Sequence, residues 1–192
     1  MAPESMAGCL EHVRGGGCVL VVDSAAEPPE AVLACAAARV TPATINLLVT
    51  HARGLVCLVL PPARMRQLGI PLIGPRGGAT PAYGASIEAR QGVSTGISAP
   101  DRATTILAAV AADATPADLV MPGHVTPVQA AQGGTLVCAA LPEAASDLVR
   151  LSGLGAEATV CTVLGGRAIS PPRPSSTRSP AATGSRASAS PR

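Results

Sequence analysis

The sequence predicts a single α+β domain, of the layered α/β kind, in which helices pack on a sheet. Three observations support this prediction. The chain has 192 residues, the size of one domain large enough to bury a core of ordinary size. Short runs rich in Val, Leu and Ile alternate along it with segments of helical pattern. The helical segments open on residues that commonly cap helices, and turn residues bound the apolar runs.

Several apolar runs have the length and composition of β-strands. Each is short, is rich in Val, Leu or Ile, and lies between residues that favour turns. We therefore expect these runs to form the sheet. They are Cys18–Val22, Leu55–Leu60, Ala85–Glu88, Thr135–Ala139 and Ala158–Leu164.

Capping residues mark the starts of the expected helices. Thr41 offers an N-cap, and Pro42 follows it at the first helical position. Ser98 and Asp101 have the spacing of a capping box. The sequence therefore predicts helices over Ala43–Thr50, from Ser98 to about Ala112, and from Pro142 to about Ser152.

Two segments differ from the rest in composition. Pro71–Pro81 is so rich in Gly and Pro that it predicts a long loop. From about Pro171 the chain contains Pro, Ser, Ala, Thr, Gly and Arg, with no acid and no aliphatic residue larger than Ala. Such a segment cannot bury enough apolar surface to offset its ordering entropy. We therefore expect an ordered domain over residues 1–170 and a disordered tail over 171–192.

The composition limits both the core and the partners. Hydrophobic residues make up 47% of the chain, yet Trp and Phe are absent and Tyr83 is the only aromatic residue. The core must then be built from Ala, Val, Leu and Ile, which bury less area each and depend on close fit. The net charge is only +2. A charge this small gives only a weak electrostatic field, and a single Tyr cannot form a surface on which bases stack. No nucleic-acid partner is therefore expected.

The six cysteines are scattered and show no CxxC spacing. Most lie in apolar runs, so we expect free thiols that behave as small hydrophobic side chains, and no disulfide framework. The segment Met1–Gly17 lacks the apolar stretch of a secretion signal. No apolar run approaches the length of a membrane span. These features favour a cytoplasmic location and no membrane partner.

Three segments resemble one enzyme family. They read VLVVDSAAEPPEAVLACAAARVT (residues 19–41), INLLVTHARGLVC (45–57) and GVSTGISAPDRATTI (92–106). They are similar to segments of 3,4-dihydroxy-2-butanone 4-phosphate synthases, magnesium-dependent lyases of riboflavin biosynthesis that release formate from ribulose 5-phosphate. The resemblance covers about Cys18–Ser170. It implies a single domain with a mixed sheet flanked by helices, and assembly as a homodimer.

The same resemblance implies that most metal and catalytic positions of the family are replaced. The two metal-ligand positions are Pro28 and Leu141 in this chain. Neither side chain has a donor atom for a hard cation. We therefore expect no magnesium site and no cofactor. The other replaced positions that the resemblance implies are Glu27, Val32, Cys138 and Thr162.

Some residues of the family site are retained. The resemblance implies catalytic roles for His124, Glu30 and Cys57, and substrate binding by Ser94 and Thr95. Structural roles compete with these. A His in PGHVTP can be a turn residue bonded to its own backbone, and Cys57 can be a core residue of a strand. Ser94 and Thr95 can satisfy backbone donors ahead of a helix.

Three functions follow from this combination. The first is a family member that has kept the fold and has lost the lyase reaction, with a structural, regulatory or small-molecule-binding role. The second is an enzyme with diverged chemistry on another phosphorylated or hydroxylated compound, using His124, Glu30 and the Ser94–Thr95 loop. The third is residual synthase activity.

The geometry of the site discriminates between the first two functions. Convergence of His124, Cys57 and the loop ending at Glu30 on one cavity would favour diverged chemistry. Filling of that space by Val32, Leu141 and Pro28 would favour a non-catalytic relative.

Overall fold

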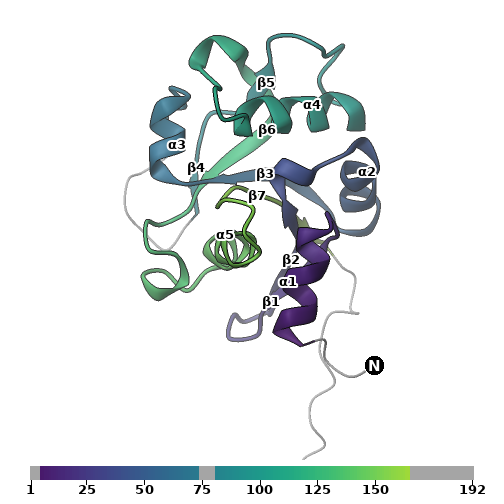
Figure 1. Ribbon diagram of the computed structural model, residues 1–192, viewed down its shortest axis with the longest axis vertical. Coiled ribbons are helices and arrows are strands. Elements are labelled where there is room, and N and C mark those ends of the chain that lie inside the picture. The colour runs from purple at the N-terminus through teal and green to yellow at the C-terminus, as the bar shows by residue number, and fades with distance from the viewer. Residues whose placement is uncertain (1–4, 74–80, 165–192) are drawn as a thin grey trace, which may run out of the picture.

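The computed structural model describes residues 5–73 and 81–164. It confirms the predicted fold class, because a seven-stranded mixed sheet lies between helices on both of its faces (Figure 1). The predicted tail, residues 171–192, and most of the predicted Pro71–Pro81 loop lie outside the described residues. The strands are β1 (Val19–Asp23), β2 (Glu30–Ala36), β3 (Arg53–Leu60), β4 (Ala82–Tyr83), β5 (Ile87–Ala89), β6 (Leu119–Gln129) and β7 (Ala158–Val163).

The strand order is β1-β2-β7-β3-β6-β4, and β5 pairs with β6 beside this path. The neighbours β3 and β6 run parallel, and the other pairs are antiparallel. The family-derived expectation of a mixed sheet is thus confirmed. Strand β1 lies at one edge of the sheet, with β2 as its neighbour.

The predicted helix starts are confirmed at two places. Thr41 and Thr44 form a capping box at the start of α2, and the Ser98 hydroxyl accepts the Asp101 N–H at 3.1 Å at the start of α4. These bonds satisfy backbone donors that have no partner within the helix. The α-helices are α1 (Met6–Arg14), α2 (Pro42–His51), α3 (Pro62–Gln67), α4 (Ala99–Val110) and α5 (Leu141–Leu151), with short 3-10 turns at Ala37–Arg39, Pro116–Asp118 and Gly134–Leu136.

Two aliphatic clusters hold the layers together. On one face of the sheet, Ile45 of α2 and Ile106 of α4 pack with Leu58 of β3. On the other face, Val149 of α5 packs with Val59 of β3. All five side chains are buried, and each contributes about 1.5–3 kcal/mol on transfer from water. As the composition requires, these clusters consist of aliphatic and sulfur-containing residues.

The predicted strand at Thr135–Ala139 is wrong. Gly133 and Gly134 adopt positive φ angles of 105° and 64°, and a 3-10 turn follows. The carboxylate of Asp147 in α5 accepts the backbone N–H of Thr135 at 2.8 Å and its hydroxyl at 2.7 Å. Because the Asp147 side chain accepts the hydrogen bond of the Thr135 N–H, the segment forms a turn that leads into α5.

The sequence analysis does not predict α1, α3, β2, β4 or β6. Strand β2 shows why a segment can be missed. Its sequence, EAVLACA, is rich in residues that favour helices. The segment pairs with β1 on one side and β7 on the other, and most of it is buried. Pairing on both sides therefore outweighs its local preference. The predicted strand at Ala85–Glu88 is displaced by a few residues, to Ile87–Ala89.

Candidate functional site

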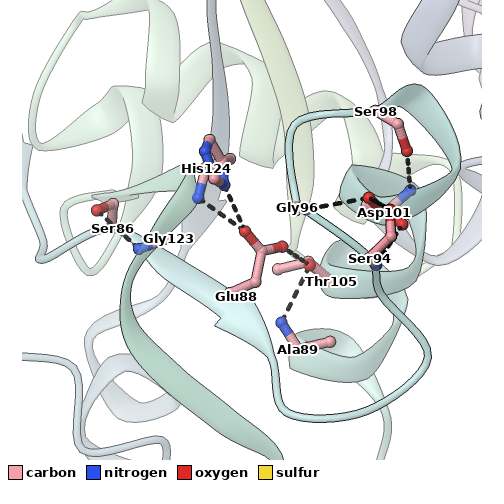
Figure 2. Close-up of polar contacts among 10 residues, drawn as sticks. All are labelled: Ser86, Glu88, Ala89, Ser94, Gly96, Ser98, Asp101, Thr105, Gly123 and His124. Atoms are coloured by element: carbon pink, nitrogen blue, oxygen red, sulfur yellow. Dashed lines mark hydrogen bonds and ion pairs between the residues drawn. The ribbon is translucent and has the colours of Figure 1, made fainter.

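Glu88, His124 and Thr105 form a polar cluster between β5, β6 and α4 (Figure 2). Glu88 Oε1 accepts the Thr105 hydroxyl at 2.6 Å. Its other oxygen, Oε2, lies 2.7 Å from His124 Nδ1 and accepts the His124 backbone N–H at 3.2 Å. Glu88 is buried, whereas the His124 side chain is 42% exposed. The cluster therefore ties a surface imidazole to a buried carboxylate.

An irregular pairing of β5 with β6 creates this contact. Ile87 pairs with Val125, but the next residue, Glu88, pairs with Val120. The intervening residues of β6 include Gly123, which passes so close to the Ile87 backbone that a Cβ there would overlap it. The chain thereby brings the His124 ring and backbone onto one carboxylate.

The Glu88 carboxylate fixes the state of the imidazole ring. An ionised carboxylate can only accept hydrogen bonds, so Nδ1 of His124 carries the proton that it shares with Glu88. In the neutral ring Nε2 then keeps its lone pair. Such a ring can act as a base or as a hydrogen-bond acceptor toward a ligand at the surface.

The loop ahead of α4 lies against the same pair. Gly96 has a φ of 86°, and a Cβ at this position would overlap both Glu88 Oε2 and His124 Nδ1. Glycine at position 96 therefore allows the loop that carries Ser94 and Thr95 to approach the pair. This places the two predicted substrate-binding residues on the segment next to His124.

Asp101 holds that loop in place. Its carboxylate accepts the Ser94 hydroxyl at 2.8 Å, the Ser94 N–H at 3.2 Å and the Gly96 N–H at 3.0 Å. The Ser94 hydroxyl is the main cause that lowers the pKa of Asp101, and the backbone bonds add to it against the effect of burial. The Ser94 hydroxyl proton is thus committed to the Asp101 side chain, whereas the structural role expected for Ser94 was a bond to a backbone donor. Thr95 is exposed.

Cys57 and Glu30 lie on strands other than that of His124: Cys57 in β3, where it pairs with Thr126 of β6, and Glu30 in β2. Cys57 is buried in β3, and burial raises the pKa of its thiol to about 12. Glu30 opens β2, is exposed, and pairs across the hairpin with Asp23. Over residues 5–73 and 81–164, no hydrogen bond joins either side chain to His124. Of the predicted site residues, the structure therefore groups His124 with the Ser94–Thr95 loop. Cys57 lies on the strand beside β6, and neither Cys57 nor Glu30 is bonded to His124 in the described residues.

The replaced positions fall into two groups. Val32 and Cys57 belong to the apolar cluster beneath α1 and α5, and Leu141 packs against this cluster. Pro28 is exposed in the turn between β1 and β2 and does not fill that space. The other replaced positions, Glu27, Cys138 and Thr162, are exposed.

The carboxylates near these positions form internal bonds. Asp23 Oδ1 accepts the backbone N–H of Ala25 at 2.9 Å, which closes a local turn. Glu143, in the first turn of α5, is buried and accepts the Ala131 N–H at 2.7 Å. Within the described ranges, no group of three or more His, Cys, Asp or Glu residues is placed to hold a metal ion. At the two positions that the resemblance assigns to metal ligands, the side chains of Pro28 and Leu141 carry no oxygen or nitrogen donor.

Two residues of the cluster, Glu88 and Thr105, are not among the predicted site residues. A signal for Thr105 does exist in the sequence, because it follows Asp101 by four residues and therefore shares a face of α4 with it. Glu88 ends a predicted strand, but its partner depends on the irregular pairing with β6. Sequence pattern alone gives no register for that pairing.

The chain also matches one family along most of its length. A family model described as 3,4-dihydroxy-2-butanone 4-phosphate synthase matches residues 7–180. A protein of that name from Pseudomonas aeruginosa is 42% identical over 166 residues, which cover 85% of this chain and 46% of that protein. Another from Ralstonia nicotianae is 43% identical over 164 residues, covering 84% and 72%. The chain thus spans less than half the length of the first of these relatives.

Solved structures give the same assignment. A two-domain 3,4-dihydroxy-2-butanone 4-phosphate synthase from A. baumannii superimposes with a TM-score of 0.79 at 42% identity, covering 84% of this chain and 48% of that one. A synthase solved in complex with two magnesium ions gives a TM-score of 0.78 at 32% identity, covering 86% and 81%. In the described residues of this chain, no helix is long and apolar enough to cross a membrane.

Proposed function

The chain belongs to the 3,4-dihydroxy-2-butanone 4-phosphate synthase family, and we propose that it has kept the family's scaffold without the formate-releasing reaction on ribulose 5-phosphate. One observation carries this proposal. Val32 and Leu141, at positions where the resemblance implies an acidic residue and a metal-binding His, pack in or against one apolar cluster with Cys57. An aliphatic cluster excludes water and offers no oxygen or nitrogen ligand to a hard cation.

The proposal also rests on the chemistry that the reaction requires. Removal of a carbon from a sugar phosphate needs a cation to polarise adjacent oxygens, and groups that move protons between carbons. Pro28 and Leu141 supply no ligand. Glu143, the acidic residue retained near Leu141, is buried and bonded to the Ala131 backbone. Over residues 5–73 and 81–164, no group of three or more His, Cys, Asp or Glu residues is placed to restore this set.

In this proposal the chain acts as a non-catalytic relative with a structural, regulatory or small-molecule-binding role. Assembly as a homodimer is part of the proposal. It is supported by exposed apolar side chains on the edge strand, Leu20 and Val22, and on the turn before α5, Leu136 and Val137. A cytoplasmic location, where thiols remain reduced, belongs to the same proposal.

A second candidate function is an enzyme of diverged chemistry. The observation that favours it is the Glu88–His124 pair, in which the buried carboxylate bonds Nδ1 of a ring whose side chain is 42% exposed. Such a ring can remove a proton from a hydroxylated compound bound beside the Ser94–Thr95 loop. This candidate requires no metal. The identity of about 42% to named synthases favours a third, residual activity of the original type.

The decisive experiment is a formate-release assay with ribulose 5-phosphate and magnesium. An intact family member serves as the positive control, and the Leu141→Ala variant of this chain as a matched negative control. We expect no formate above background from this chain in a preparation that unfolds cooperatively. Turnover within about tenfold of the positive control would overturn the proposal.

Binding measurements separate the first two functions. Calorimetric titration with ribulose 5-phosphate, with and without magnesium, is expected to show no dependence on the metal. If the wild-type protein forms a product and the His124→Ala variant does not, the result would support diverged chemistry over a non-catalytic role.

A further inference from the structure

Cys18 and Cys35 face one another across the first hairpin of the sheet. In the β1–β2 register Val19 pairs with Ala34, so the next position places Cys18 opposite Cys35. Cys35 belongs to the core cluster beneath α2 and α4, and Cys18 packs against the same cluster. The Cys35 thiol donates to the Thr159 carbonyl oxygen at 3.8 Å. Register and packing therefore place Cys18 and Cys35 as neighbours on one face of the hairpin.

This arrangement suits a disulfide without movement of the backbone. Directly opposed residues of antiparallel strands have Cα atoms about 4.5–5.5 Å apart. Disulfides span Cα separations of about 4.4–6.8 Å. Both kinds of antiparallel pair fall inside that range. Neither Cys18 nor Cys35 is bridged in this structure, so the pair is in its reduced form.

The two thiols differ in reactivity. Cys18 is half-buried, and its interaction with the neighbouring Cys35 thiol lowers the pKa of the Cys18 thiol. Cys35 is only 1% exposed, and the same interaction, together with burial, raises the pKa of its thiol. The thiolate is the nucleophile in thiol–disulfide exchange. Cys18 is therefore the residue that a reagent in solution meets first, and Cys35 the one that resolves the adduct.

We propose that Cys18 and Cys35 form a reversible redox pair that closes the β1–β2 hairpin when the protein meets a small-molecule disulfide. The Cys18 thiolate attacks one sulfur of the reagent, which forms a mixed disulfide and releases the first thiolate. Cys35 gives its proton to solvent, and its sulfur attacks Cys18, which forms the protein disulfide and releases the second thiolate. The protein loses two hydrogens, and the reagent is reduced to two thiols.

The bridge acts on the edge of the sheet. It closes a ring over residues 18–35, which contains β1, the turn with Pro28 and most of β2. Strand β1 has β2 as its neighbour in the sheet, so the cross-link fixes an edge strand that is otherwise held on one side. A ring of this size restricts the unfolded chain, and we expect the melting temperature to rise by about 5–10 °C on oxidation. The proposal does not depend on which reaction, if any, the family site performs.

The test uses the full chain with glutathione disulfide as the probe. After incubation at pH 8, remaining thiols are alkylated and the protein is mapped by peptide mass spectrometry. We expect a peptide pair joined through Cys18 and Cys35, lost again on addition of excess glutathione. The oxidised protein is expected to melt at the higher temperature given above.

Two single variants serve as matched controls. In Cys35→Ala the resolving thiol is absent, so a glutathione adduct should accumulate on Cys18. In Cys18→Ala the buried Cys35 should acquire none, and oxidation should leave the melting temperature unchanged. If a variant fails to fold, peptide mass spectrometry of the oxidised wild-type protein still tests the proposal. Oxidised wild-type protein in which Cys18 and Cys35 remain unlinked, or carry separate adducts, would overturn the proposal.

Discussion

The carboxylate of Glu88 lies 2.7 Å from Nδ1 of His124, although the two residues are 36 positions apart in sequence. The same carboxylate accepts the Thr105 hydroxyl, and so links α4 to β5 and β6. It orients the imidazole of the candidate site through Nδ1, and the His124 side chain remains partly exposed. The stability of this part of the fold and the state of the ring therefore depend on one buried acid.

Glu88→Ala tests that dependence. The variant leaves the Thr105 hydroxyl and the His124 backbone N–H without their acceptor, which should lower the free energy of unfolding by about 1–3 kcal/mol. Urea unfolding at pH 7 measures the loss, and ¹⁵N NMR should show that His124 no longer favours a protonated Nδ1. The exposed Glu11→Ala is the control, with a change within about 0.5 kcal/mol. Equal effects of the two variants would contradict the assigned role.

Gly96→Ala tests the close approach of the loop to the pair. The added Cβ would overlap Glu88 and His124, and it would also place a side chain on a residue with a φ of 86°. We expect a loss of about 2–5 kcal/mol. Gly153→Ala is a matched control, because φ there is 78° and no atom lies within 4 Å of the added Cβ. The control should show only the backbone strain, about 1–2 kcal/mol, and a similar loss in both variants would disprove the steric contact.

The lowered pKa of Asp101 predicts how the stability of the protein depends on pH. This pKa is lowered chiefly by the Ser94 hydroxyl, so the contribution of Asp101 is fully present above the usual carboxyl pKa and is lost as pH falls through the lower folded value. Wild-type protein should therefore lose stability as pH falls below about 4. Asp101→Asn should be less stable at pH 7 and should show a shallower decline in thermal melts over pH 2–5. Parallel declines would mean that Asp101 makes no such contribution.

Cys57 should be inert toward thiol reagents in the folded protein. Burial raises the pKa of its thiol from 9.0 to about 12, so the thiolate fraction at pH 8 falls roughly 10³-fold. Alkylation by iodoacetamide, followed by peptide mass spectrometry, should label the exposed Cys138 first and Cys57 only in urea. Labelling of both at similar rates in native buffer would show that Cys57 lies in an open site.

Val32→Asp tests the apolar character of the replaced site. The substitution would place a carboxylate in the cluster with Cys57, and we expect a loss of at least about 3 kcal/mol at pH 7. Burial raises the pKa of a carboxyl, so the loss should shrink as pH is lowered. Val32→Ala removes volume without charge and should cost about 1–2 kcal/mol, independent of pH. If the acidic variant were as stable as wild type at pH 7, the cluster would have to be open to solvent.

The sequence predicted the elements whose local signals agree with their final environment. Thr41 and Ser98 cap helices as predicted, and the apolar run at Leu55–Leu60 lies in the central strand β3. It did not predict β2, because an Ala-rich segment becomes a strand only when it pairs on both sides. It wrongly predicted a strand at Thr135–Ala139, where a carboxylate twelve residues away binds the backbone.

The candidate site divides in the same way. His124 and the Ser94–Thr95 loop were predicted from their resemblance to family motifs, and the structure places them together against Glu88 and Gly96. The catalytic and binding roles of these residues stay predictions. The resemblance also implied roles for Glu30 and Cys57, and no hydrogen bond in the described residues joins either of them to His124. Each residue of this chain can be matched to a family motif on its own. Whether the matched side chains meet at one site depends on how the strands pair.

The sequence by itself determined the fold class, the family and the aliphatic nature of the core, because these follow from composition, periodicity and motifs that are local in the chain. Only the tertiary structure decided which side chains meet. The Glu88–His124 contact depends on a shift in the β5–β6 pairing, and the opposition of Cys18 and Cys35 depends on the β1–β2 register. Both follow from long-range pairing, in which a shift of one residue turns every side chain to the other face of the sheet.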